Sequence, residues 1–461
     1  MIDLRITQKP VHFKLEVSKK DSPTTSFAGL ALIRESLKRL GLAEEMKQFL
    51  LKKAGYADEI VIEALILLIA AGGRSLSDWD YLCKEEGFVR FFDPCPSVDT
   101  LERYLRRLSL KTPERSSNKG QVGYAFQLEY LHTILIQKAY QLSGSPKQLT
   151  ADIDTTITYS ENREAEFTYD KEKGYQPMMV YCPELAMVIA HEFRDGNVSP
   201  AEGYDRLFVR CRKMFPEVSW TVRSDAAGYQ LASSTSGSES RAAGSGLEWL
   251  DAIHTFLYYV TAKQCDTMLE ILKKETSWIP LIKDGIKTEQ EISEIAYVPT
   301  FSLQEQMRSR RGQRFIATRK KRKQLDVWEG EYIYQVIVTN DANSDLCAIM
   351  KTHRGRCGSI EFANAEIKNG CGMDHMPANS FSVNAAWFSL GVMTHNLLKL
   401  IQNHILPETM KKIEIKTLRF RLMRLAAIVI KKAKQTILRF SKNHPAFEIY
   451  QKAWANLQVL A

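Results

Sequence analysis

Apolar residues recur at helical spacing along the first third of the chain. SFAGLALIRESLKRLGL (26–42) and IVIEALILLIAAG (60–72) place apolar side chains three or four positions apart. This spacing predicts amphipathic or buried helices across residues 27–145. The second run is shorter than a bilayer-spanning segment and contains Glu63, so it reads as a buried helix.

A short basic helix is predicted within this region. In PSVDTLERYLRRLSL, Ser97 or Asp99 can cap a helix from which three arginines project. A turn followed by a short basic helix is typical of helix-turn-helix DNA-binding domains, although a solvated surface helix explains the same pattern. The three arginines are Arg103, Arg106 and Arg107.

The pattern changes to that of strands after residue 148. LTADIDTTITY, PMMVYC and LAMVIAHEF predict three strands, the last two joined by a turn at Pro183-Glu184. An amphipathic helix follows, with Ser199 as its N-cap and Pro200 at its first position. VSWTVRSD then predicts a strand that ends at Asp225. The order β-β-β-α-β predicts an α/β core.

A β-rich insertion is expected next. A Ser/Gly-rich stretch (230–246) precedes TFLYYVTAK, EISEIAYVPTF, QRFIATRKKRK and EYIYQVIVTND, which predict strands. FSVNAAWFSLGVMTHNLLKLIQNHI then predicts a long buried helix, and basic helices are expected to close the chain. The expected organisation is a helical DNA-binding domain (1–145), a core in two parts (146–229 and 351–405), the insertion (230–350) and a basic helical C-terminal region (406–461).

Composition adds a candidate partner. The 461 residues carry a net charge of +9, and residues 308–323 hold nine Lys or Arg and no acid, while 411–442 contain a single acid, Glu414. Such clusters suit a polyanion such as nucleic acid, although each could be a solvated face. The eight cysteines form no CxxC pair, and the N-terminus lacks an apolar signal region. A reduced cytosolic protein is therefore expected.

Carboxylates provide the candidate chemistry. Asp152 and Asp154 share one face of a predicted strand because side chains alternate along a strand. Asp225 follows another strand, and Glu361 lies on a predicted helix, two turns before Lys368. Carboxylate oxygens are the ligands that Mg²⁺ or Mn²⁺ prefers, and two such ions support phosphoryl transfer. Asp and Glu in this order also occur by chance in a chain of this length.

These segments resemble motifs of one enzyme family. DTTITY, RSDAAGY and RCGSIEFANAEIKNG, in this order, are similar to the motifs of DDE transposases of bacterial insertion sequences. The β-rich insertion and the Glu361–Lys368 spacing resemble the cut-and-paste branch with a Y-R-E-K signature, and FSVNAAW resembles its thirteen-eighty group. The resemblance spans about residues 60–440 and implies an RNase H-like catalytic core interrupted by the insertion.

The resemblance also implies residue roles. Asp154, Asp225 and Glu361 would be catalytic and bind two ions of Mg²⁺ or Mn²⁺, with Asp152 as the alternative first ligand. Residues Arg356, Lys368 and His353 near the active site, Arg103, Arg106 and Arg107 on the short helix, and Trp328 or Tyr332 in the insertion would contact DNA.

The sequence departs from the signature at two positions. His353 stands in place of the tyrosine, and four residues rather than three separate Arg356 from Glu361. Glu366 is an alternative acid without the spacing to Lys368. A buried aromatic core is the alternative role for Trp328 and Tyr332.

The resemblance implies a bacterial, nucleoid-associated enzyme that acts as a homodimer on terminal inverted repeats and target DNA. Hairpin-ended intermediates are expected in this branch. Two alternatives stay open: an RNase H-like nuclease without strand transfer, and an inactive DNA-binding relic of a transposase.

Overall fold

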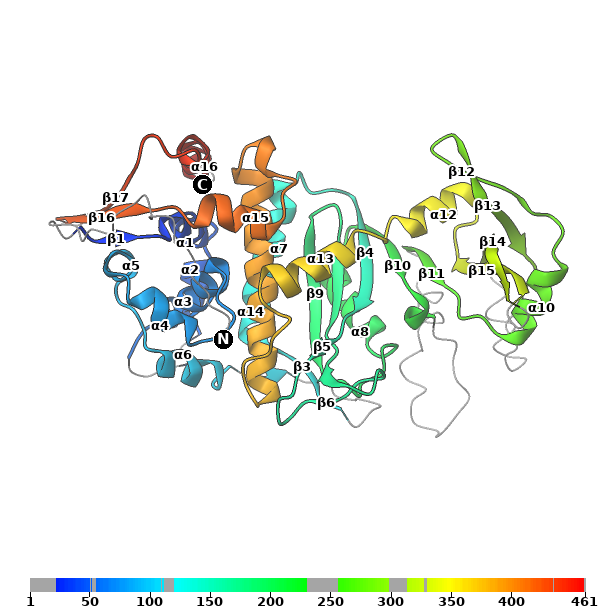
Figure 1. Cartoon of the computed structure of the whole chain (residues 1–461), viewed down its shortest axis with the longest axis horizontal. Coiled ribbons are helices and arrows are strands. Elements are labelled where there is room, and N and C mark those ends of the chain that lie inside the picture. Colours follow the sequence, from blue (N-terminus) through cyan, green and yellow to red (C-terminus); the bar gives the residue numbers. More distant parts are fainter. Residues whose placement is uncertain are drawn as a thin grey trace, which may run out of the picture.

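The computed structural model describes residues 22–49, 51, 55–108, 110–111, 120–229, 256–297, 313–326, 330–433 and 435–459. It shows a mixed α/β protein in which a long helix, α14 (Phe381–Leu400), stands between a helical part and a large sheet (Figure 1). Nearly every residue of α14 is buried, which confirms the predicted long buried helix. An apolar helix of this kind is stable only where neighbours cover it on all sides.

Short helices form the N-terminal part, as predicted. They pack around α3, whose apolar positions are buried, and around Trp79, which contacts Phe88 and Phe92 edge-on and donates from Nε1 to the Pro96 carbonyl at 2.7 Å. The helices are α1 (Ala31–Arg39), α2 (Leu42–Lys47), α3 (Asp58–Ala71), α4 (Asp78–Cys83), α5 (Glu86–Phe92), α6 (Val98–Leu105) and α7 (Phe126–Leu142). The N-cap of α6 is Ser97, whose side chain accepts from the Thr100 N–H.

The large sheet has eleven strands among the described residues, in the order β12-β13-β14-β15-β11-β10-β4-β8-β9-β3-β2. At its centre, β4 pairs in parallel with β10, which pairs in parallel with β11, while β4, β8 and β9 run antiparallel. The central strands are β4 (Gln148–Thr155), β8 (Met178–Cys182), β9 (Met187–Arg194), β10 (Ser219–Ser224) and β11 (Phe256–Thr261), with β2 (Leu110–Lys111) and β3 (Val122–Ala125) at one edge.

Helices cover both faces of this centre, and β9 is accordingly buried at all eight positions. His191 contacts Ser389 of α14 on one face, and Glu192, which points to the other face, pairs with Arg206 of α8 (Tyr204–Met214). Because successive side chains point to opposite faces and both faces are covered, every position of β9 is buried. Helix α8 begins four residues later than predicted, after Gly203 at φ 98°, and Ser199 lies in the preceding turn.

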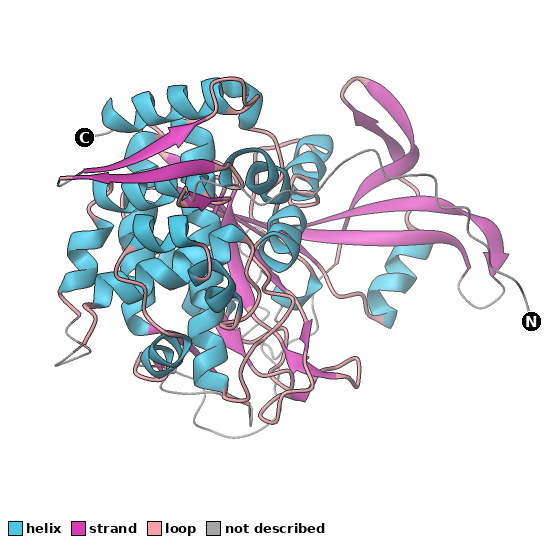
Figure 2. Cartoon of the chain, turned by 60° about the vertical axis from the view of Figure 1, so that its left-hand side comes forward, coloured by secondary structure: helices cyan, strands magenta, loops and turns pink. Residues whose placement is uncertain are grey.

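The insertion forms a lobe that projects from the body (Figures 1 and 2). It contains α10 (Asp266–Lys274), β12 (Ile279–Lys283), β13 (Ile286–Ile295), β14 (Arg314–Asp326) and β15 (Gly330–Thr339), and the helix α12 (Leu346–Arg354) leads back to the body. The strand β11, expected within the insertion, instead extends the central sheet through its parallel pairing with β10.

The C-terminal region is not wholly helical, which corrects the prediction. Residues Ala427–Lys432 (β16) and Gln435–Phe440 (β17) pair as a hairpin, which β1 (Thr24–Thr25) extends. Three consecutive β-branched residues, from Ile428 to Ile430, favour strands over helices at this point. Helical elements flank the hairpin: α15 (Ile415–Leu418) before it and α16 (Phe447–Val459) after it.

A third sheet is small and lies beside the central strands. It contains β5 (Thr158–Tyr159), β6 (Glu166–Phe167) and β7 (Lys173–Tyr175). No helix in the described ranges is both long and apolar enough to span a bilayer.

Candidate acidic active site

The parallel register of β4 and β10 brings Asp154 and Asp225 to the same edge of the sheet. Arg223 lies opposite Asp152, and Ser224 lies opposite Ile153. Asp225 directly follows the last residue of β10, so it lies near the level of Asp154. Residues at equivalent levels of neighbouring strands project to the same face, and the two carboxylates therefore share one face at the carboxyl ends of these strands.

Asp154 lies in a half-closed environment where its side chain is 15% exposed. The Asn364 amide donates to its Oδ2 at 3.2 Å, and Arg356 Nη1 lies 3.8 Å from the same oxygen. Burial raises the pKa of Asp154 to about 6, Arg356 opposes this rise, and the negative charges of Asp225 and Glu361 add to it. Asp154 therefore lies near enough to Asp225 and Glu361 to be affected by their charges.

Two hydrogen bonds hold Asp225. Its Oδ1 accepts from the Ala227 N–H at 3.0 Å and from the Tyr204 hydroxyl at 3.3 Å. Burial, together with the charges of Asp225 and Asp154, raises the pKa of Tyr204 well above its usual value. The phenol therefore stays protonated and remains a donor to the carboxylate.

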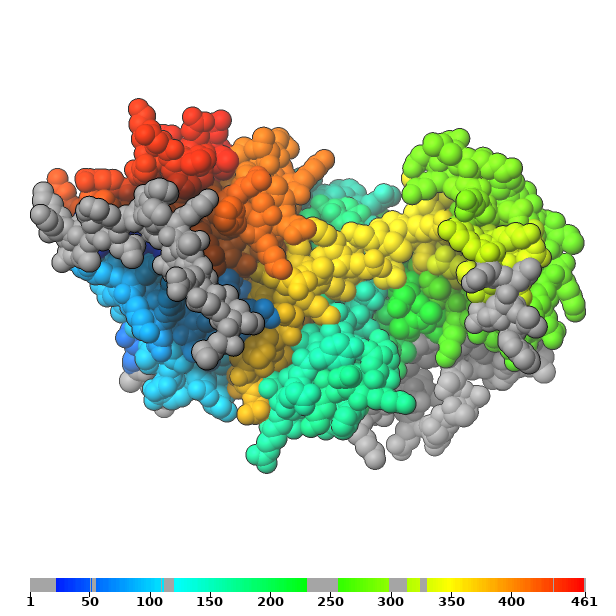
Figure 3. All heavy atoms as spheres, in the orientation of Figure 1, coloured from blue at the N-terminus to red at the C-terminus, as the bar shows by residue number. Residues whose placement is uncertain are grey.

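Glu361 lies in the first turn of α13 (Ile360–Ala365) and is exposed. A π-helical turn, Glu366–Gly370, follows directly. Such turns are rare and recur at functional sites. In Figure 3 the α12–α13 segment (yellow) runs across the front of the molecule between the body and the insertion lobe.

The alternative acid Glu366 is committed to the fold. It is 5% exposed, lies 2.6 Å from Lys399 Nζ and accepts from the Ile415 N–H at 3.1 Å. His395 Nε2 lies 3.3 Å away. These partners hold Glu366 in a buried network, whereas Glu361 is exposed and remains open to a ligand.

Asp152 is paired within the fold, and its role as the alternative first metal ligand stays a prediction. It is fully buried, and its two oxygens accept from Arg223 Nε and Nη2 at 2.6 and 2.7 Å. Ser359 Oγ donates to its Oδ2 at 2.5 Å. The sequence correctly predicts that Asp152 and Asp154 share a face, but only Asp154 is left open to a ligand.

The three residues matched to the signature besides Glu361 are buried or half-buried: His353, Arg356 and Lys368. His353 is 1% exposed, its Nε2 lies 3.0 Å from Thr261 Oγ1, and burial together with Arg356 lowers its pKa to about 4. His353 is therefore buried and neutral, and its contact with DNA stays a prediction. Lys368 donates to the Ile157 carbonyl, which ties the π-turn to the strand edge. Arg356 faces Asp154, and its Nε finds no partner among the described residues.

The other predicted DNA contacts lie far from the acids in sequence and on other elements. Arg103, Arg106 and Arg107 are exposed on α6 and its last turn, and Arg106 pairs with Glu102 at 2.8 Å. Trp328 lies outside the described residues. Tyr332 packs against the guanidinium of Arg319, which also lies over Trp278, each at 4.5 Å to the ring centroid.

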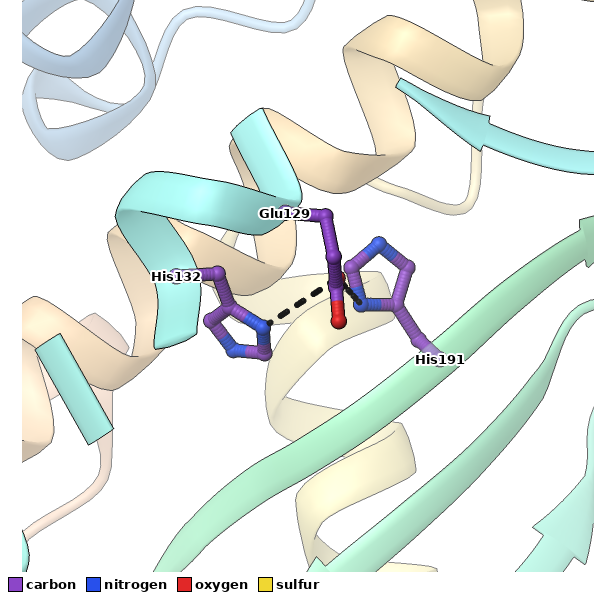
Figure 4. A group of neighbouring side chains, drawn as sticks. All are labelled: Glu129, His132 and His191. Carbon is purple, nitrogen blue, oxygen red and sulfur yellow. Dashed lines mark ion pairs between the residues drawn. The ribbon is translucent and has the colours of Figure 1, made fainter. Parts of the chain in front are cut away.

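A second cluster of possible ligands, which the sequence did not reveal, joins α7 to β9 (Figure 4). Glu129, His132 and His191 bring one ligand atom each within 4.8 Å of the others. Glu129 Oε2 lies 3.7 Å from Nδ1 of each histidine, and none of these three atoms has a hydrogen-bond partner among the described residues.

The donor pattern around this cluster opposes a metal ion. The Asn396 amide is oriented by two bonds to the Val188 backbone, and its Nδ2 donates to His132 Nε2 at 2.7 Å. A neutral His132 therefore carries its proton on Nδ1, the atom that would have to bind the ion. The Arg210 guanidinium already neutralises Glu129 and holds its pKa below the usual range although burial raises it. A buried water that accepts from His132 Nδ1 and donates to the other two atoms would satisfy all three.

The acids at the strand ends suit hard cations better, because carboxylate oxygens are the preferred ligands of Mg²⁺ and Mn²⁺. In the described chain, Asp154, Asp225 and Glu361 do not bring three oxygens within 4.8 Å of one another.

The comparison with family models confirms the DDE transposase family read from the motifs. A family model described as transposase DDE domain group 1 matches residues 9–461. Among solved structures, the chain is similar to the piggyBac transposase in a cryo-EM structure of its synaptic complex with hairpin DNA, with 11% identity, coverage of 88% of this chain and 83% of that chain, and a TM-score of 0.45. A comparison with curated proteins finds no match.

Proposed function

The chain belongs to the transposase DDE domain group 1 family, and from this premise we propose that it is a cut-and-paste transposase that uses Asp154, Asp225 and Glu361 for metal-dependent phosphoryl transfer on DNA. The observation that carries this proposal is the register of β4 and β10, which brings Asp154 and Asp225 to one face while Glu361 adds its charge from α13. Membership of the family makes the protein an enzyme that acts on DNA.

The strand order supports an RNase H-like core. Three antiparallel strands, β9-β8-β4, continue into the parallel strands β10 and β11, and the long connection after β11 contains the insertion. Helix α13 then returns Glu361 to the edge where the two aspartates lie. An acid on the first strand, an acid after the fourth and an acid on a later helix form the arrangement expected of this core.

Two ions of Mg²⁺ or Mn²⁺, when bound by these acids, would activate the attacking oxygen and stabilise the leaving oxygen. The residues of the chain hold this site in shape. Tyr204 and the Ala227 N–H orient Asp225, and Asn364 orients Asp154. Arg356, whose Nη1 lies 3.8 Å from Asp154 Oδ2, would contact a phosphate oxygen of the scissile strand.

In the reaction we propose, water attacks the phosphorus at the element end, and the strand breaks with a 3′-hydroxyl as the leaving group. That hydroxyl then attacks the opposite strand, so one phosphodiester bond forms as another breaks and the end closes as a hairpin. Reopening and attack on target DNA complete the transfer. The protein contributes positioning and charge neutralisation rather than covalent chemistry.

The DNA contacts are also part of the proposal. The α6 arginines would contact terminal inverted repeats, and the basic strand β14 would lie along the DNA backbone. Two ends must be held together for transposition, so we propose a homodimer on DNA. The origin in a bacterial insertion sequence of the thirteen-eighty group, and a nucleoid-associated location, remain predictions from the motifs.

Cleavage of a duplex that carries the element end tests the proposal. We expect wild-type protein to cut with Mg²⁺ or Mn²⁺ and not with EDTA, and Asp225→Asn to bind DNA but not to cut it. The matched control is Asp205→Asn on α8, which makes the same chemical change outside the site and should cut normally.

The products distinguish the alternatives. Hairpin ends or joining to target DNA support the transposase, whereas open ends alone support an RNase H-like nuclease. Binding without cleavage, on a verified end sequence, would contradict the enzyme and leave a DNA-binding relic.

A further inference from the structure

Each of the three candidate acids is preceded, two positions earlier, by a member of one hydrogen-bonded unit. Asp152 precedes Asp154, Arg223 precedes Asp225, and Ser359 precedes Glu361. We call Asp152, Arg223 and Ser359 the clamp. Its members come from β4, β10 and the start of α13, so the elements that carry the acids are the same elements that the clamp joins.

The contacts within the clamp are short and directional. Arg223 forms a bidentate pair with Asp152 through Nε and Nη2 at 2.6 and 2.7 Å. Ser359 Oγ donates to Asp152 Oδ2 at 2.5 Å. Asp152 is fully buried and Arg223 is 8% exposed, so water does not compete strongly for these bonds. A bidentate pair fixes orientation as well as distance.

Ser359 occupies a position where serine normally caps a helix, yet its side chain does not cap α13. Instead Ser359 Oγ contacts Asp152 and the Arg356 carbonyl. The helix therefore gives up a hydrogen bond to its own backbone, and the hydroxyl serves the link to β4. This use of the serine is unexplained by the stability of α13 alone.

A further hydrogen bond, donated by Arg223, extends the clamp to α12. Arg223 Nη1 donates to the Thr352 carbonyl at 2.8 Å. Next to it, Gly355 leaves the space that the guanidinium fills, because a Cβ on Gly355 would lie 2.4 Å from Arg223 Nη1. The clamp thus also anchors the segment by which the chain returns from the insertion lobe.

Spacing explains how the clamp acts on the acids. Residues two apart on a strand lie on the same face and about 7 Å apart. Locking Asp152 to Arg223 sets how far β4 and β10 are shifted relative to one another, and hence the separation of Asp154 and Asp225. Locking Ser359 to Asp152 sets where the first turn of α13 begins, and hence the position of Glu361.

We infer that Asp152, Arg223 and Ser359 are positioning residues that set the separations of the three metal-binding carboxylates. This inference rests on the proposed function of the acids. Mg²⁺ demands near-ideal octahedral geometry, whereas a larger or more tolerant ion accepts displaced ligands. Loosening the clamp therefore weakens Mg²⁺ use more than Mn²⁺ use.

The test uses full-length protein with Ser359→Ala, the conservative Ser359→Thr, and Gly355→Ala, which crowds Arg223 without removing a polar group. The readouts are the metal concentration for half-maximal cleavage, in Mg²⁺ and in Mn²⁺, and the rise in melting temperature that each metal causes without DNA. The control is Ser36→Ala on α1, which removes a buried serine hydroxyl that bonds to the Leu32 carbonyl.

We expect Ser359→Ala to raise the half-maximal Mg²⁺ concentration by about 10-fold or more, within the range seen for residues that orient metal ligands. The shift in Mn²⁺ should be several-fold smaller, and Ser359→Thr should restore most of the Mg²⁺ response. Gly355→Ala should act in the same direction, and Ser36→Ala should leave both metal responses unchanged.

Equal losses in both metals, or an unchanged Mg²⁺ response in a folded Ser359→Ala variant, would overturn the inference and leave the clamp as a stabilising ion pair. The melting experiment separates this failure from failure of the proposed function. If wild-type protein is stabilised by metal but cuts no DNA, the proposed function fails while the positioning effect is still measurable. If neither metal stabilises wild-type protein, the carboxylate site and the clamp inference both fail.

Discussion

Ionised Asp154 should lower the free energy of unfolding of the metal-free protein, so we expect Asp154→Asn to make that protein more stable. Burial of a carboxylate costs free energy when the group is ionised. The pKa of Asp154 rises from 3.8 to about 6, which is about two units. At about 1.4 kcal/mol per unit, the ionised group costs the folded state about 3 kcal/mol at pH 8.

The pH dependence has a definite sign. Between pH 3.8 and about 6 the folded protein binds more protons at Asp154 than the unfolded chain does, so the free energy of unfolding falls as pH rises through this window. The difference between Asp154→Asn and wild type should be largest above pH 7 and should vanish below about pH 4. Comparing the two proteins removes the contribution of other titrating groups, which both share.

Thermal melting in EDTA at pH 8 and pH 4.5 measures this difference, and saturating Mg²⁺ should reverse it. Wild-type protein gains stability from the bound ion, and the variant, which lacks one ligand, gains less. Asp152→Asn is the informative contrast, because it leaves the buried Arg223 unpaired and should destabilise the protein by about 3–5 kcal/mol. An Asp154→Asn variant that is less stable than wild type in EDTA at pH 8 would refute the reasoning.

Three further predictions concern the acids, the buried histidine cluster and the α6 arginines. Glu361→Gln should abolish cleavage without loss of stability, because Glu361 is exposed. Glu366→Gln should lower the free energy of unfolding by about 3–5 kcal/mol, because it leaves Lys399 buried and unpaired. Urea unfolding of both variants would show whether the two acids have been assigned correctly. Glu129→Gln should destabilise the protein because it leaves Arg210 without its carboxylate partner. Zn²⁺ should not raise the melting temperature of an Asp225→Asn protein if the buried Glu129 cluster binds no metal, and a Zn²⁺-dependent rise that Glu129→Gln removes would show that the cluster does bind one. Replacing Arg103, Arg106 and Arg107 by alanine should leave stability unchanged, because all three are exposed. It should reduce the slope of log DNA affinity against log salt concentration, measured by fluorescence anisotropy, by up to about 0.9 for each phosphate that they neutralise. An unchanged slope would mean that DNA binds to another surface.

The local pattern of residues in the sequence determined most of the central helices and strands of this protein. Short runs of β-prone residues bounded by turns predicted the strands β4, β8, β9 and β10, and helical spacing predicted α7 and α14. The motifs also identified the family, which the match over residues 9–461 confirms. Where the pattern was weak, in the basic C-terminal segment, β-branched residues and pairing with β1 produced a hairpin in place of a helix.

Tertiary structure decided which of the candidate acids are paired with a basic residue of the protein and which are open to a ligand. Asp152 and Asp154 are equivalent in the sequence, two residues apart on one strand, and only the register with β10 places Arg223 opposite the first of them. Likewise, Glu366 is removed from the choice by Lys399 and by the Ile415 N–H, which lie 33 and 49 residues further along the chain. A residue's chemistry depends on what neutralises it, and for a buried carboxylate the neutralising group comes from another element of the fold.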